Sequence, residues 1–364
     1  MLTIDRMLIA AAALAGIASA SPPAHAQTAR AELPPAETLD ALAPAGSPFA
    51  YALSGQKSEM LTEAAAAPPE SSRVVGGRVA DNGAWPWQVG LVLAGRPVGP
   101  QTHFCGGSMV LDDWVLTAAH CLVVPDANGA YFVLAPHQLQ IVVGTNTLRP
   151  GAGDVVGVRS IHLHPGYDPD GFDDDMALVR LERRPAAPFQ TVSVPTSEFA
   201  NILDEPGIPT IVTGWGLTEW GTKPAEMHEV QIQMMPRELC NADLLEGPMT
   251  LAANGFVLAV EALGVTDDDA QMLWESLLER TPQPLSANMI CSGAFEGGKT
   301  SCNGDSGGPL VVPLQDGSYT QVGVVAFGLA DNTSRSCDTS ARFSVYMRTA
   351  NYLPWMNMVL SANP

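Results

Sequence analysis

The hexapeptide Gly304-Asp305-Ser306-Gly307-Gly308-Pro309 is the most informative stretch of this 364-residue chain. A nucleophilic serine needs a base, a group that orients the base, and hydrogen-bond donors for the oxygen that becomes negative during the reaction. Glycines beside Ser306 let backbone N–H groups approach a reacting carbonyl with no side chain in the way. A Gly-Asp-Ser-Gly tetrad alone is compatible with an ordinary turn. The longer string, with Cys302 two residues before its first glycine, favours a reactive serine.

A histidine stands at the end of a run of small residues, Thr117-Ala118-Ala119-His120-Cys121. A single histidine is more often structural than reactive. This one directly precedes a cysteine that can anchor its backbone, and the small residues before it permit tight packing. We therefore interpret His120 as the candidate base for Ser306.

An acidic run leads straight into an apolar segment in Asp173-Asp174-Asp175-Met176-Ala177-Leu178-Val179-Arg180-Leu181. The strand-like segment should draw the last carboxylate, that of Asp175, partly inside. A buried carboxylate needs a partner, and the ring N–H of His120 would serve. We expect Asp175 to orient His120, and we expect Asp173 and Asp174 to belong to a solvated acidic loop.

The overall composition is that of a globular protein with ample apolar material for a core. Hydrophobic residues make up 46% and charged residues 15% of the chain. The formal net charge is −20. Because the phosphates of nucleic acid would repel such a chain, we expect no nucleic-acid partner, and solubility outside a cell is the simpler meaning of the charge.

The first residues predict export. Arg6 precedes an apolar run over residues 7–20, which is short for a membrane span, and Ala24-His25-Ala26 is a small-x-small cleavage site. We expect residues 1–26 to be a signal peptide, with an uncleaved anchor as the alternative. The mature chain would then be secreted or periplasmic, without membrane contact. The six cysteines fit an oxidising compartment, although their number leaves the pairing open.

The amino-acid composition of the chain changes at about residue 73. Residues 27–73 are rich in Ala, Pro, Ser and Glu and predict a loosely ordered propeptide. Beyond it, short apolar and β-branched runs are separated by Gly, Pro, Asn and Asp, which predicts an all-β sandwich or barrel. Examples of these runs are residues 89–93, 140–143, 210–212 and 321–327.

Two segments break the β pattern. Residues 351–360 carry apolar side chains at helical spacing and predict a C-terminal helix packed on the barrel. Within an insertion over residues 241–287, Thr266 precedes three aspartates and predicts the start of a capped amphipathic helix. We read the aspartates as helix-start residues rather than as a metal site. The apolar face of this helix should bury itself on the barrel or on a partner, and its members are Leu273, Trp274, Leu277 and Leu278.

Taken together, residues 74–364 resemble the trypsin/chymotrypsin-like serine proteases. The three motifs occur in that family's order of His, Asp and Ser. Three further motifs agree with the resemblance: Trp85-Pro86-Trp87-Gln88-Val89, His103-Phe104-Cys105-Gly106-Gly107-Ser108 and Gly214-Trp215-Gly216.

The resemblance implies an all-β fold of two packed six-stranded antiparallel β-barrels with the active site between them. It implies a serine endopeptidase that forms an acyl-enzyme on Ser306, with His120 as general base and then acid and Asp175 as orienter. The N–H groups of Gly304 and Ser306 would form the oxyanion hole. Protein or peptide substrates and no cofactor are implied.

The resemblance also selects one pairing of the cysteines. The implied bridges are Cys105–Cys121, Cys240–Cys291 and Cys302–Cys337. The further bridges of vertebrate relatives are absent, which, with the signal peptide, suggests a bacterial-type secreted enzyme.

Arg73-Val74-Val75-Gly76-Gly77 resembles the family's activation sequence. Cleavage after Arg73 would free the α-amine of Val74, which would pair with Asp305 and fix the oxyanion hole. Before cleavage, the resemblance suggests that His103 holds Asp305 instead. An ordinary basic linker is the alternative interpretation of Arg73.

The expected specificity pocket departs from that of trypsin-like members that cleave after Lys or Arg. Thr300 stands where those members have an Asp, so nothing obvious neutralises a cationic P1 side chain. With Ser301, Phe327, Gly328-Leu329 and Ser344 as walls, we expect an uncharged P1 residue of middle to large size. Glutamate at P1 is the alternative, since hydroxyl groups and the adjacent Lys299 could receive it. Activation after Arg73 would then require a separate protease.

Two further departures concern support of the site. Ala326 replaces a serine that usually hydrogen-bonds the triad Asp, a loss worth about 1 kcal/mol. The segment 144–156 offers only Asp154 as an acidic ligand, so we expect no calcium there and no metal elsewhere.

Two other classes of function remain open. A protease-fold binding protein without activity usually lacks a triad residue, and none is missing here. An esterase of the α/β-hydrolase class uses the same three residue types, but in another chain order and with a Gly-x-Ser-x-Gly elbow.

Overall fold

The computed structural model describes residues 77–126, 129–218, 221–328 and 341–364. The expected signal peptide 1–26 and propeptide 27–73 lie outside the described residues, as do Val74, Leu329 and Cys337. Residues 236–287 form a compact unit of their own within the described chain.

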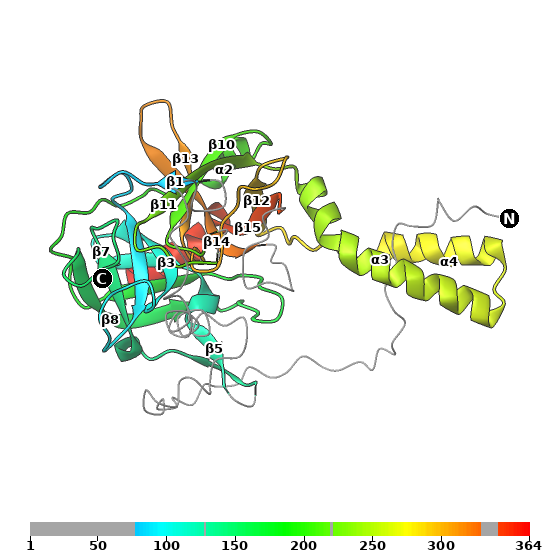
Figure 1. The fold of residues 1–364 in the computed structure, drawn as a ribbon, viewed down its shortest axis with the longest axis horizontal. Coiled ribbons are helices and arrows are strands. Elements are labelled where there is room, and N and C mark those ends of the chain that lie inside the picture. Colours follow the sequence, from blue (N-terminus) through cyan, green and yellow to red (C-terminus); the bar gives the residue numbers. More distant parts are fainter. Residues whose placement is uncertain (1–76, 127–128, 219–220, 329–340) are drawn as a thin grey trace, which may run out of the picture. The chain divides into compact units, whose positions relative to one another are not determined.

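The first barrel is a closed antiparallel sheet with strand order β2-β3-β4-β9-β8-β7. Figure 1 labels three of its strands, β3, β7 and β8. Its core is filled by β-branched and leucine side chains with no exposed surface, such as Val89, Leu116 and Ile141. Its strands are β2 (Gln88–Leu93), β3 (His103–Leu111), β4 (Trp114–Thr117), β7 (Leu139–Val143), β8 (Asp154–Leu163) and β9 (Ala177–Leu181). A two-stranded sheet beside it joins β5 (Val123–Pro125) to β6 (Tyr131–Val133).

The second barrel has the order β11-β10-β13-β14-β15-β12, and antiparallel pairing of β11 with β12 closes it. Its core contains Val212, Leu310 and the fully buried Tyr346. Its strands are β10 (Pro209–Gly214), β11 (His228–Met234), β12 (Met289–Gly293), β13 (Pro309–Pro313), β14 (Tyr319–Gly328) and β15 (Phe343–Arg348). The short β1 (Arg78–Val79) pairs with β11. The prediction of two six-stranded barrels is confirmed.

Short helices accompany the barrels. Thr196 accepts a hydrogen bond from Phe199 N and thereby caps α2 (Ser197–Leu203). The chain ends in the 3-10 helix η5 (Thr349–Tyr352) and in α5 (Leu353–Ala362). Trp355, Met356 and Val359 of α5 are buried, so the predicted C-terminal helix is confirmed.

The unit 236–287 contains two long helices, α3 (Arg237–Leu263) and α4 (Asp267–Arg280). The predicted start of α4 is confirmed, because Thr266 Oγ1 accepts a hydrogen bond from Asp269 N at 3.2 Å. Helix α3 was not predicted, and Gly247 and Pro248 in its interior explain why. Gly264 ends α3 in the left-handed region, at φ 64°.

The apolar face predicted for α4 is only partly buried. The Trp274 ring packs on Phe256 of α3, with ring centroids 5.0 Å apart, and Ala252 and Ala253 complete this small cluster. Leu273 remains 53% exposed. None of the helices in the described ranges combines the length and the apolar character that a membrane span requires.

Candidate active site

His120 and Asp175 contact one another twice. Asp175 Oδ2 lies 2.7 Å from His120 Nδ1, and Asp175 Oδ1 accepts a hydrogen bond of 2.8 Å from the His120 backbone N–H. His120 lies in the 3-10 helix η3 (Ala119–Cys121), and Asp175 lies two residues before β9. The carboxylate of Asp175 is fully buried, so the contacts with His120 offset its loss of hydration. The bond from Nδ1 leaves Nε2 of the ring as the atom that can receive a proton.

A disulfide between Cys105 and Cys121 supports the histidine segment. It joins β3 of the first barrel to the residue that follows His120. Cys240, Cys291 and Cys302 are also disulfide-bonded, and their implied partners remain predictions. Cys337 lies outside the described residues.

Close packing at Gly106 and Gly307 places the loop that carries Ser306 against the segment that contains His120. Gly106 N donates a hydrogen bond of 2.8 Å to Ser306 O. A Cβ atom at Gly307 would collide with Thr117 Oγ1 and would lie 3.0 Å from Ala118 N. Gly307 also has φ 77°, which favours glycine. The loop that carries Ser306 therefore lies against the residues that directly precede His120.

The half-buried Ser306 presents free hydrogen-bonding groups. Among the described residues, its Oγ makes no hydrogen bond to His120 Nε2, a contact that often tightens only when substrate binds. Within the same residues, neither the Gly304 N–H nor the Ser306 N–H donates a hydrogen bond. Gly304 has φ 102°, which only glycine adopts readily. Two unused donors beside a serine are what an oxyanion hole requires.

Asp305 is buried behind the serine. Its carboxylate accepts hydrogen bonds of 2.8 Å from Gly216 N and 2.9 Å from Cys302 N. A Cβ atom at Gly214 or Gly216 would collide with this carboxylate. Burial raises the pKa of Asp305 to about 6, although the two backbone donors act in the opposite direction.

The histidine expected to hold Asp305 does not do so here. His103 is buried, and its Nε2 has no hydrogen-bond partner among the described residues. Its ring packs edge-on against Trp215, with centroids 5.6 Å apart. Burial, and to a lesser extent the nearby Lys223 charge, lower the pKa of His103 to about 3 against the opposing effect of a backbone hydrogen bond at Cys105, so the ring is neutral at pH 7.

Most of the residues named for the specificity pocket lie together. Thr300, Ser301 and Ser344 are buried, and Ser301 N donates a hydrogen bond of 3.2 Å to Ser344 Oγ. Thr300 Oγ1 donates one of 3.0 Å to Ser301 O. A Cβ atom at Gly328 would lie 3.4 Å from Ser301 O and 3.5 Å from Ser344 Oγ. Within the described part of the chain, no carboxylate hydrogen-bonds to Thr300, Ser301 or Ser344.

An aromatic wall beside His120 includes one residue that the sequence did not reveal. The Phe172 ring lies 5.6 Å from the His120 ring and 5.9 Å from the Phe327 ring, between centroids. Phe172 has φ 53°, which is rare for an aromatic residue and indicates a constrained loop. Its place three residues before Asp175 was the only available signal.

The expectation that Asp174 is solvated was wrong. Its side chain is 22% exposed and receives hydrogen bonds of 3.0 Å from Tyr352 Oη and from Asn288 Nδ2. His164 Nδ1 lies 3.5 Å from Asp174 Oδ2. Asp174 has φ 52°, a conformation that Asp tolerates better than most residues. Its carboxylate thus joins the loop that carries Asp175 to the C-terminal segment.

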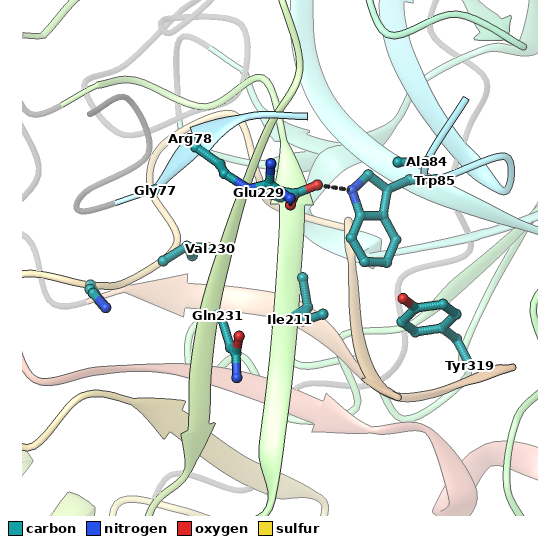
Figure 2. Close-up of a pocket in the computed structure, with 10 residues that line it drawn as sticks. Gly77, Arg78, Ala84, Trp85, Ile211, Glu229, Val230, Gln231 and Tyr319 are labelled. Carbon is teal, nitrogen blue, oxygen red and sulfur yellow. Dashed lines mark hydrogen bonds and ion pairs between the residues drawn. The ribbon is translucent and has the colours of Figure 1, made fainter. Parts of the chain in front are cut away.

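A separate pocket of about 480 Å³ lies beside β1 and β11 (Figure 2). Glu229 accepts a hydrogen bond of 2.6 Å from Trp85 Nε1 and pairs with Arg78 at 2.6 Å. Lys299 also lines this pocket, together with Tyr319. Its lining includes none of the candidate residues His120, Asp175 and Ser306.

One cluster in the described ranges has metal-like geometry, formed by Cys105, His120 and Cys121. The sulfur atoms of both cysteines are bound to one another, so neither is a thiolate that could ligate a metal. The cluster therefore does not fit a metal ion.

Comparison with known proteins agrees with this geometry. The family model described as Trypsin matches residues 74–356, which is more than half of the chain. The chain is also similar to the serine protease filzig of Drosophila melanogaster, with 30% identity over 292 residues. The match covers 80% of this chain and 14% of that protein, so the chain spans only a small part of its relative.

Proposed function

Because the chain belongs to the trypsin family of serine proteases, we propose that it is an endopeptidase with Ser306 as nucleophile, His120 as base and Asp175 as orienter. The observation that carries the proposal is the double contact of the buried Asp175 with His120. The serine loop lies against the same segment through Gly307. Nucleophile, base and orienter are the parts that acyl transfer requires.

The proposed reaction proceeds in two halves. Ser306 Oγ bonds to the peptide carbonyl carbon while His120 Nε2 takes the hydroxyl proton. His120 then gives that proton to the leaving amine, the C–N bond breaks, and an acyl-enzyme remains. Water attacks the ester with His120 again as base, which releases the acid product and restores Ser306. The free N–H groups of Gly304 and Ser306 stabilise the oxyanion in both halves.

We also propose that cleavage after Arg73 activates the chain. The family match begins at residue 74, and Asp305 is buried with only backbone N–H donors among the described residues. An α-amine at Val74 would supply the missing cation for this carboxylate. Because Asp305 directly precedes Ser306, the new ion pair would fix the backbone of the oxyanion hole. In the precursor, His103 would bind Asp305 only after one of the two side chains changes its position.

For specificity we propose an uncharged P1 residue of middle to large size. Thr300, Ser301 and Ser344 offer hydroxyl groups and no carboxylate, so a buried Lys or Arg side chain would lack a counter-charge. Lys299 lines the separate pocket of Figure 2, which weakens the alternative of glutamate at P1.

The setting proposed for the enzyme is extracellular or periplasmic, with protein or peptide substrates and a separate activating protease. Disulfide bonds support an oxidising compartment. The bacterial-type assignment has no support from the comparisons, since the relative described above is an insect protein.

Active-site labelling tests the proposal. The chain cleaved at Arg73 should react with a fluorophosphonate probe at Ser306 and hydrolyse denatured protein substrates, because the probe needs an activated serine. Ser306→Ala should fold with an unchanged circular dichroism spectrum and lose both properties. If the cleaved, folded chain neither reacts nor hydrolyses any member of a peptide library, the protease-fold binding protein is the correct alternative.

A further inference from the structure

Helix α3 presents an apolar stripe for which the described residues offer no cover. Leu251, Gly255, Leu258 and Ala262 recur at steps of four, three and four residues, so they share one face over about 16 Å. All four are exposed, Leu251 by 76% and Leu258 by 66%. Helix α3 contacts α4 through another of its faces, which carries Ala252, Ala253 and Phe256. We call Leu251, Gly255, Leu258 and Ala262 the α3 stripe.

The helical unit has little core of its own. Within the 27 residues of α3, four are buried, and Ala270 is the one buried residue of α4. In a soluble protein, most of a helix's stability comes from burying an apolar face. A helix of this length with two exposed leucines in line suggests that it is completed by another molecule.

The acidic character of this helical unit indicates that the molecule that completes it is cationic. Between Arg237 at the start of α3 and Arg280 at the end of α4, neither helix has a basic residue. The acidic residues of the two helices are Glu238, Asp243, Glu246, Glu261, Asp267, Asp268, Asp269, Glu275 and Glu279. By helical spacing, Glu261 lies three residues beyond Leu258, beside the α3 stripe.

We propose that the α3 stripe is a docking surface for a cationic amphipathic helix of a partner protein. Leucine side chains of the partner would pack between Leu251 and Leu258, where Gly255 and Ala262 allow close approach of the two backbones. Its lysine or arginine side chains would face the carboxylates of α3.

Other occupants fit the charge less well. Two copies of the unit would bring nine carboxylates against nine, and the whole chain has a net charge of −20. The chain's own residues 27–73 contain six acidic and three basic residues, so they also carry like charge. Anionic lipid surfaces would repel the unit in the same way.

A peptide-binding experiment tests the proposal on the full chain with Ser306→Ala, so that the probe stays intact. The probe is a fluorescent peptide of about 18 residues, made of leucine and lysine at helical spacing. One control peptide has the same composition in scrambled order, and another has glutamate in place of lysine. Fluorescence anisotropy should give a micromolar Kd for the patterned lysine peptide only, and the affinity should fall as salt is raised.

Matched variants locate the binding surface. Leu251→Gln with Leu258→Gln should raise the Kd at least about tenfold, and Glu261→Gln, beside the α3 stripe, about threefold. Ile202→Gln with Met358→Gln changes two side chains of similar exposure, 61% and 60%, on α2 and α5, and should leave the Kd within about twofold. Circular dichroism verifies that each variant keeps its helix content.

Several results would overturn the proposal. Equal binding of the scrambled peptide, or equal loss in the Ile202/Met358 variant, would mean that attraction is nonspecific. Self-association that Leu251→Gln with Leu258→Gln abolishes, seen by sedimentation velocity, would identify a second copy as the occupant. Peptide binding that appears only after cleavage at Arg73 would identify the chain's own leader segment.

Discussion

The buried carboxylate of Asp175 holds His120 at two points, through the ring Nδ1 at 2.7 Å and through the backbone N–H at 2.8 Å. The first contact sets the tautomer of the ring, and the second sets the position of the residue that carries it. One side chain thus controls both the position of His120 and which of its ring nitrogens carries the proton.

Asp175→Asn should lower kcat/KM by about 10⁴-fold, because an amide that donates to Nδ1 would place the ring proton on Nε2. The fold should survive, since the amide oxygen can still accept the His120 backbone N–H. Steady-state kinetics on the cleaved chain and a thermal unfolding curve measure the two effects. A variant that keeps more than about a tenth of the activity would remove Asp175 from the triad.

Gly307→Ala should lower the unfolding free energy by more than the positive φ angle of Gly307 alone explains. Gly307 and Gly317 have φ of 77° and 82°, but a Cβ atom at Gly317 meets nothing within 4 Å. Gly317→Ala therefore measures the backbone strain alone, about 1 kcal/mol. Gly307→Ala adds a collision with Thr117 and should cost at least about 2 kcal/mol more in unfolding free energy, with loss of activity. Equal costs for the two variants would mean that the serine loop does not rest on the histidine segment.

The sequence predicted the barrels better than it predicted the loops. The run over residues 321–327 is mostly apolar and contains three valines, and the strand β14 (Tyr319–Gly328) follows from that pattern. Asp174 was misjudged because its partners Tyr352 and Asn288 are far away in the sequence. Local polarity resembled that of a solvated loop, and only the tertiary fold brings those donors to the carboxylate.

The same limit applies to α3 and to Phe172. Gly247 and Pro248 weaken the helical pattern of α3 locally, while its length and its contact with Trp274 sustain the helix. The orientation of the Phe172 ring depends on a left-handed backbone, which no residue type at this position predicts. The candidate triad was accessible because its three members stand in short, distinctive motifs.

Asp305 should make the stability of the uncleaved chain depend on pH. Its pKa is about 6 in the folded chain against an ordinary 3.8, so the folded state binds a proton that the unfolded state has released. The resulting contribution to the unfolding free energy is complete below about pH 4 and is lost as pH rises through about 6, and it amounts to about 3 kcal/mol.

Denaturant unfolding of the Ser306→Ala precursor at pH 4 to 7, with and without Asp305→Asn, measures this contribution. The difference between the two curves should change across that range, whereas Asp81→Asn, at a side chain that is 84% exposed, should give a constant difference. Parallel curves for Asp305→Asn would mean that the carboxyl has an ordinary pKa in the folded chain.

Thr300 should decide the charge of the preferred P1 residue. Substrates with Leu, Met, Phe or Tyr at P1 should exceed those with Arg or Lys by at least about tenfold in kcat/KM, because the buried hydroxyl groups supply no counter-charge. Thr300→Asp should reverse the order, and Thr300→Asn, of similar size without charge, should not. If the unmodified enzyme prefers Arg or Lys, the proposed preference for an uncharged P1 residue is wrong.

Activation should require a second protease. The expected cut follows Arg73, whereas Thr300, Ser301 and Ser344, at the proposed specificity site, have no carboxylate hydrogen-bonded to them within the described ranges, so the chain should accept its own activation sequence poorly. Cleavage by another enzyme would free the amine of Val74, and pairing with that amine would lower the raised pKa of Asp305. The order of these events can be read from the N-terminus and the activity of the same sample.

Unmodified and Ser306→Ala precursors are incubated alone and then with trace trypsin. Both should stay uncut alone, and both should give a Val74 N-terminus with trypsin, but only the unmodified chain should then become active. Arg73→Gln should block the cut and the activity together, since trypsin needs a basic residue there. If the unmodified precursor alone produces the Val74 N-terminus while Ser306→Ala stays uncut, the enzyme cleaves after Arg, and the proposed specificity of the Thr300 pocket is wrong.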